Sequence, residues 1–114
     1  MSDVVYINFE EGVKRVMNNS AFYIKMLKKY KEDKNLKDID EAIKDGDMEK
    51  AKIAAHTLKG LAGNLSLTEL YKESQKLEKQ IKDGELDIEQ FEIVKKINEQ
   101  TLIEVEKVVT ENEG

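Results

Sequence analysis

The sequence contains no cysteine, no proline and only one histidine in 114 residues. Without cysteine there is neither a disulfide framework nor a thiolate metal site, and a lone histidine lacks the converging ligands that a metal centre needs. No apolar run approaches the length needed to span a bilayer, and the N-terminus is too acidic and too short in apolar residues to predict a signal peptide. We therefore expect a cytoplasmic protein without a membrane segment, metal or other cofactor.

The chain also lacks an excess of positive charge and a phosphate-binding loop. Its formal net charge is −5, which argues against nucleic acid as a partner because binding to the phosphate backbone draws on a basic surface. No glycine-rich loop follows a predicted strand, so we expect no ATP site and no kinase activity. A long heptad seam is missing as well, so a monomer is expected.

What the chain does contain is helical periodicity throughout, in a length that suits one domain covering residues 1–114. Residues 1–7 are expected to be an extended lead-in. The predicted helices cover residues 8–18, 19–31, 35–45, 47–64, 66–83 and 87–110. Because the connections are short, neighbouring helices should be antiparallel. The predicted fold is an all-α, antiparallel up-and-down four-helix bundle built from the last four helices, with the two short N-terminal helices packed at one end.

Capping residues mark most of these boundaries. The predicted helix starts are Asn8 with Glu11, Asn19-Ser20, Asn35, Asp47, Ser66 with Glu69, and Asp87 with Gln90. Two Asp-Gly pairs, at 45–46 and 83–84, have helix-periodic flanks, so their glycines are interpreted as helix C-caps rather than hairpin turns. The side chains expected to face inward outside the fourth helix are Phe9, Val13, Val16, Met17, Phe22, Tyr23, Met26, Leu27, Tyr30, Leu36, Ile39, Ala42, Ile43, Leu67, Leu70, Tyr71, Ser74, Leu77, Ile81, Ile88, Phe91, Val94, Ile97, Thr101, Val105 and Val108.

The predicted helix 47–64 carries the single histidine, His56. At about 100° per residue, its apolar residues form one core-facing stripe and His56 points almost directly away from the centre of that stripe. The stripe consists of Ala51, Ala54, Ala55, Leu58, Leu61, Ala62 and Leu65. The outward face around the histidine carries Glu49, Lys52, Ile53, Lys59, Gly60 and Gly63.

The outward face has features that stability does not explain. Gly60 and Gly63 follow the histidine by four and seven residues, although a glycine inside a helix costs about 1 kcal/mol relative to alanine. They should leave bare surface beside the ring. Lys59 and Lys52, one turn on either side, can offset negative charge, and Ile53 is either a docking contact or a flank of the core. An exposed imidazole is nucleophilic near pH 7, so this face suits phosphoryl transfer, although a lone surface histidine is most often without a role.

The segment His56-Thr57-Leu58-Lys59-Gly60-Leu61-Ala62-Gly63-Asn64-Leu65 resembles the signature of histidine-containing phosphotransfer (HPt) domains, with Lys-Gly three and four residues after the histidine and then a small residue and glycine. The order of helices is similar as well. This resemblance implies that His56 accepts a phosphoryl group from an aspartyl phosphate on a receiver domain and passes it to another receiver aspartate. It also implies that Lys59 stabilises phosphohistidine, that Gly60 and Gly63 admit the partner, and that any divalent metal belongs to the receiver.

The chain departs from the family pattern at two positions. Ser66 stands where a further glycine is common, and we expect it to cap the next helix together with Glu69. Glu78 corresponds to a position that often holds a glutamine bonded to the histidine or the phosphoryl group, and Gln75 lies one turn before it. The sequence leaves open which of the two, if either, contacts His56. The alternative function is a non-catalytic docking module that binds receiver or kinase domains and carries an inert histidine.

Overall fold

Six helices make up most of residues 4–113, the part of the chain that the computed structural model describes. They are α1 (Phe9–Arg15), α2 (Ser20–Tyr30), α3 (Asn35–Asp45), α4 (Met48–Asn64), α5 (Thr68–Lys82) and α6 (Ile88–Glu113). No strand occurs between residues 4 and 113, so the all-α prediction is confirmed. Residues 4–7 form neither helix nor strand, as expected for a lead-in, and residues 1–3 of that predicted segment lie outside the described residues.

Side-chain caps begin three of the helices at the predicted residues. The side-chain oxygens of Asn8, Asn19 and Asp47 each accept a hydrogen bond from the backbone N–H three residues on, at 3.0–3.2 Å. These bonds satisfy N–H groups that have no partner within the helix. The predicted cap at Asn35 is wrong. Asn35 is the first residue of α3, and Asp33 accepts its backbone N–H at 3.0 Å instead.

Glycines end two helices as predicted. Gly46 and Gly84 have φ angles of 72° and 73°, in the left-handed region that terminates helices at little cost only when the residue lacks a Cβ. The first helix ends three residues before the predicted boundary, because Met17 and Asn18 also adopt positive φ angles of 56° and 64°. Met17 is consequently exposed rather than turned inward. The last helix continues past residue 110 to Glu113.

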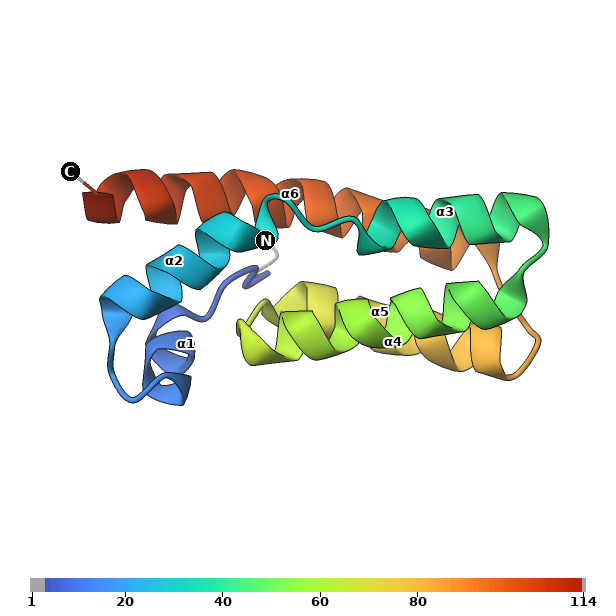
Figure 1. Cartoon of the computed structure of the whole chain (residues 1–114), viewed down its shortest axis with the longest axis horizontal. Coiled ribbons are helices and arrows are strands. Elements are labelled where there is room, and N and C mark those ends of the chain that lie inside the picture. Colours follow the sequence, from blue (N-terminus) through green and yellow to red (C-terminus); the bar gives the residue numbers. More distant parts are fainter. Residues whose placement is uncertain (1–3, 114) are drawn as a thin grey trace.

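The helices contact one another largely in chain order. α3 packs against α4, α4 against α5, and α5 against α6, while α2 packs against α6 and α1 against α2. Figure 1 shows α6 running along most of the molecule. Below it in this view, α4 and α5 lie side by side. The molecule is elongated, with principal extents of 44 × 31 × 21 Å. This arrangement places one face of α4 in the core and leaves the opposite face on the surface.

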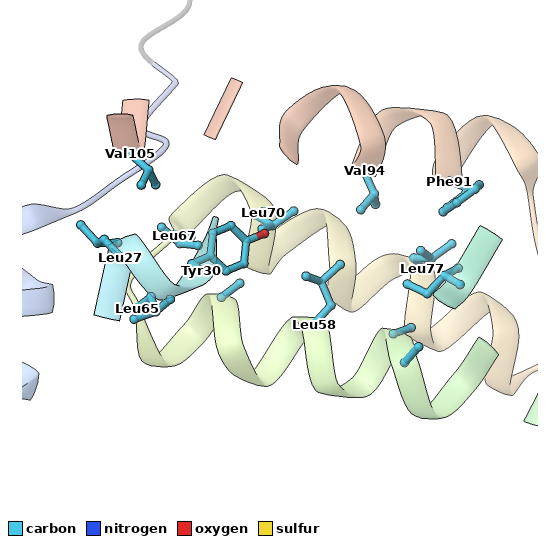
Figure 2. Close-up of a cluster of buried hydrophobic side chains, with 14 of the residues drawn as sticks. Leu27, Tyr30, Leu58, Leu65, Leu67, Leu70, Leu77, Phe91, Val94 and Val105 are labelled. Atoms are coloured by element: carbon cyan, nitrogen blue, oxygen red, sulfur yellow. The ribbon is translucent and has the colours of Figure 1, made fainter. Parts of the chain in front are cut away.

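The core is a single cluster of apolar side chains to which α2, α3, α4, α5 and α6 all contribute. Figure 2 shows several of them converging between α4, α5 and α6, among them Leu58, Leu77 and Val94. Each fully buried leucine of this kind stabilises the fold by about 1.5–3 kcal/mol relative to an exposed one. On α4 the inward stripe faces the core as predicted, although Leu61 is only partly buried. The alanines in the stripe allow close approach of the neighbouring helices; the buried residues of this helix are Ala51, Ala54, Ala55, Leu58 and Ala62.

Three further residues expected in the core are exposed. Phe22, Tyr71 and Ile88 lie on the surface, whereas Ile24 and Val109 are buried although they were not predicted to be. The neighbouring predictions on the same helices hold for Tyr23, Leu27, Phe91 and Val94. The errors therefore fall at the edges of apolar stripes. At such an edge, rotating the helix about its axis by less than the roughly 100° between consecutive residues decides whether a side chain lies in the core or in solvent.

Candidate functional site

His56 lies on the outer face of α4, opposite its buried alanines. Its side chain is 67% exposed, while Ala55 before it and Leu58 after it are completely buried. The orientation follows from helical geometry, since residues close to 180° around the axis from a core stripe must face solvent. The predicted outward orientation of the only histidine is confirmed.

Glu78 on α5 joins His56 and Lys59. One carboxylate oxygen of Glu78, Oε2, lies 2.6 Å from Nδ1 of His56, and the other, Oε1, lies 2.8 Å from Nζ of Lys59. Lys59 follows His56 by three residues on the same face of α4, so one side chain from α5 can reach both. Between the two residues that the sequence left open, Glu78 rather than Gln75 is therefore the one in hydrogen-bonding contact with the ring.

The charges of this cluster support one another. Burial by itself raises the pKa of Glu78, but hydrogen bonds from Lys59 and His56 outweigh it and hold the pKa of this carboxyl below its ordinary value. The hydrogen bond to Glu78 in turn raises the pKa of Lys59. Glu78 is therefore ionised near neutral pH and can only accept hydrogen bonds. Nδ1 of His56 must then be the donor, which leaves the lone pair of the neutral ring on Nε2.

The two glycines beside the histidine have different surroundings. A Cβ built on Gly60 meets nothing within 4 Å, so this position is open surface as predicted. A Cβ on Gly63 would lie 3.1 Å from the ring of Tyr71. The expectation of bare surface at Gly63 is therefore wrong, because Tyr71, which the sequence placed in the core, packs over it from α5. Glycine at position 63 allows this ring to lie close to the backbone of α4.

The remaining predicted site residues lie one turn before His56 on α4. Ile53 is exposed and apolar, so it is part of the outer surface rather than a flank of the core. Lys52 is partly exposed and pairs with Glu49 of its own helix at 3.3 Å. Exposed ion pairs of this kind are worth less than about 1 kcal/mol, so the ammonium group of Lys52 can leave Glu49 at little cost when another anion approaches.

The turn from α4 to α5 differs from its prediction. Ser66 does not cap α5: it adopts a positive φ of 55°, and Leu67 occupies the cap position without a side-chain hydrogen bond. The Ser66 hydroxyl donates to Glu11 of α1 at 2.8 Å, and its carbonyl accepts the backbone N–H of Asn8 at 2.9 Å. A left-handed conformation is what glycine adopts most readily, which explains why a glycine would suit this position.

A pocket of about 550 Å³ opens beside the histidine-bearing face, between α1, α4 and α5. Its lining includes Lys59, Gly60 and Tyr71, together with Arg15 of α1. Neither Tyr71 nor Arg15 was predicted as a site residue, and Tyr71 was expected in the core. Tyr71 could have been found from its spacing, because it precedes Glu78 by two helical turns on the same face of α5. Arg15 carries no such signal, since its position depends on how α1 packs.

The family model of the Hpt domain matches residues 29–109, which is more than half of the chain. Hpt domains are the phosphocarrier modules of two-component phosphorelays: they take part in histidine phosphotransfer and interact with receiver domains. The chain belongs to this Hpt domain family. The matched segment contains α3, α4 and α5 whole and most of α6, whereas α1 precedes it. No curated protein and no solved structure matches the chain.

No helix between residues 4 and 113 combines the length and the apolar character needed to cross a membrane. In the same part of the chain, no three residues of the types histidine, cysteine, aspartate and glutamate gather where they could hold a metal ion.

Proposed function

We propose that His56 is the phosphorylated residue of this domain, and that it takes a phosphoryl group from an aspartyl phosphate of one receiver domain and passes it to the aspartate of another. The observation that carries the proposal is the contact between Glu78 and Nδ1 of an exposed His56 at 2.6 Å. With Nδ1–H donating to a carboxylate, the nucleophilic lone pair is on Nε2. Membership in the Hpt family supports the same residue, because the signature histidine falls within the matched segment.

In this proposal the residues around the ring bind and orient the partner. Lys59 offsets negative charge on the phosphoryl oxygens, since transfer of this group depends mainly on positioning and charge compensation. Gly60 provides close approach to the backbone of α4, and Gly63 lets the Tyr71 ring lie against the same helix, where the ring can contact the partner. Ile53 supplies an apolar docking contact and Lys52 a second positive charge. The divalent metal that assists the reaction would be held by the receiver.

The domain is proposed to be a phosphocarrier without an ATP site, so the phosphoryl group must come from another protein. We further propose that residues 1–114 form a single domain in which α3–α6 are an antiparallel up-and-down bundle, and that the protein acts as a cytoplasmic monomer without nucleic acid. The contacts of α3 with α4, α4 with α5 and α5 with α6 support the bundle.

A transfer experiment tests the proposal. Purified receiver domains phosphorylated with acetyl phosphate would be mixed with this protein, and the products separated on a gel that retards phosphoproteins. We expect one label on the wild type that is acid-labile, as phosphohistidine is, and none on His56→Gln. Circular dichroism of the variant should be unchanged, because the side chain is exposed. Persistent labelling of His56→Gln would refute the assignment.

A further inference from the structure

Both carboxylate oxygens of Glu78 are engaged at the same time. Oε2 accepts from His56 and Oε1 accepts from Lys59. The Glu78 side chain is only 16% exposed, against 67% for His56, so water competes weakly for the carboxylate. Lys59 is itself largely covered, with a side chain 23% exposed. The ammonium group nearest in sequence to the phosphoryl acceptor is therefore already paired before any phosphate arrives.

The proton on Nδ1 matters for the reaction in both directions. When the Nε2 lone pair attacks phosphorus, the bond from phosphorus to the donor aspartate breaks and its electron pair stays on that carboxylate. The ring now carries a positive charge, with its proton still on Nδ1. In the onward step, a receiver carboxylate oxygen attacks phosphorus, the Nε2–P bond breaks, and the electron pair returns to Nε2. The ring then leaves as neutral imidazole, a better leaving group than the imidazolate anion that a deprotonated Nδ1 would require.

A carboxylate against Nδ1 favours the protonated ring of phosphohistidine, because an opposite charge in contact stabilises the charged form. The other charged groups of this face are Lys59 and, one turn before His56, the ion pair of Lys52 with Glu49. Of all these groups, only Glu78 places a negative charge in contact with the ring. The same carboxylate reduces the stabilisation that Lys59 can give to a group carrying about −1.5 to −2 charges.

We propose that Glu78 shortens the lifetime of phosphorylated His56, by keeping Nδ1 protonated and by competing with the phosphoryl oxygens for Lys59, so that this domain is a fast phosphoryl donor rather than a store of phosphate. The inference rests on the proposed function and adds the residue that regulates it. Glu78 is a positioning residue, because it acts through His56 and Lys59.

The substitution Glu78→Gln removes the negative charge at position 78 and keeps the size and shape of the side chain. An amide of the same size has one acceptor oxygen instead of two. It can still accept from Nδ1–H, but its NH₂ group then faces Lys59, which is released toward the phosphoryl group. The matched control is Glu69→Gln, which removes one carboxylate from the same helix and an ion pair with Lys72 at 2.9 Å, and leaves the cluster at His56 intact.

The experiment uses potassium phosphoramidate, a chemical donor that phosphorylates histidine without a protein partner. After removal of the donor, the loss of phosphohistidine is followed by ³¹P NMR in the wild type, Glu78→Gln and Glu69→Gln. Phosphohistidine should decay at least about fivefold more slowly in Glu78→Gln, as expected for loss of one unit charge near a phosphoryl group, and at the wild-type rate in Glu69→Gln. Equal or faster decay in Glu78→Gln overturns the proposal, as does failure of the folded variant to accept phosphate.

A second measurement needs no variant at position 78. In wild-type protein labelled with ¹⁵N in its histidine, the ring nitrogens of phosphorylated His56 should show a protonated Nδ1 at pH 7. A deprotonated Nδ1 would overturn the proposal even if Glu78→Gln failed to fold. The proposed function fails separately: in that case the wild type itself would take no phosphoryl group on His56, from phosphoramidate or from a receiver.

Discussion

Replacing Gly60 by larger residues should raise stability and impair transfer at the same time. The position is exposed and inside α4, and a Cβ there meets no atom within 4 Å. Gly60→Ala should therefore increase the free energy of unfolding by about 0.8–1 kcal/mol, the difference in helix propensity between the two residues. For a domain of this size, that corresponds to a rise in Tm of about 4 °C. Urea or thermal denaturation followed by circular dichroism measures it.

The functional half of this prediction uses Gly60→Leu. If a receiver packs against this surface, a leucine side chain must be accommodated in the interface, and overpacking of this kind costs about 1–3 kcal/mol. Transfer from a phosphorylated receiver should then be at least about tenfold slower, since 1.4 kcal/mol corresponds to a factor of ten. The reaction with phosphoramidate, which needs no docking, should slow far less.

Two outcomes would refute the reasoning about Gly60. If Gly60→Leu accepts the phosphoryl group from the receiver as fast as the wild type does, the open surface is not used for docking. A loss of stability in Gly60→Ala would show that the position is not free. Gly63→Ala is the contrast, because its added methyl group meets the Tyr71 ring at 3.1 Å. It should gain less stability than Gly60→Ala, by about the energy needed to displace that ring.

Three further predictions concern stability. Gly12→Ala should lower the free energy of unfolding by about 1–3 kcal/mol in urea denaturation, because the added methyl group overlaps the ring of the fully buried Tyr23; unchanged stability would mean that the ring has room to move. Ser66→Gly should be more stable than Ser66→Ala by about 1 kcal/mol, because both lose the bond to Glu11 but only glycine relieves the positive φ angle; a more stable alanine variant would contradict this. The pKa of Glu78 is lowered on folding, so its contribution to stability is complete above its ordinary value of 4.5 and is lost as the pH falls through the folded-state value. The difference in urea midpoint between wild type and Glu78→Gln should therefore shrink below about pH 4.5, and a constant difference would contradict the ion pair.

The sequence predicted the elements of the fold better than their edges. Local signals were sufficient where a side chain caps its own helix, as at Asn8 and Asp47, or where glycine permits a positive φ angle, as at Gly46. Ser66 was misread because its conformation is set by the partners of its hydroxyl and carbonyl on α1, more than fifty residues away in the chain. No local pattern contains that information.

The site was predictable to the same extent. The outward orientation of His56 and the open surface at Gly60 follow from the period of α4 alone. The covering of Gly63 by Tyr71 and the choice of Glu78 over Gln75 depend on the rotation of α5 about its own axis. One helix cannot specify that rotation by itself, because it depends on the packing of α5 against α4 and α6. The roles of His56, Lys59, Lys52, Ile53 and the glycines remain predictions for the experiments described above.

The bridge made by Glu78 links the reactivity of the histidine to the fit between two helices. His56 and Lys59 belong to α4 and Glu78 to α5, and contacts of 2.6 and 2.8 Å tolerate little sliding. A shift of α5 by one residue along its axis, about 1.5 Å, would move the Glu78 carboxylate relative to both partners. The buried leucines between these helices, Leu58 and Leu77, therefore align the imidazole as well as stabilise the fold. Small substitutions at these two buried leucines would alter the reactivity of His56 on the surface while the protein stays folded.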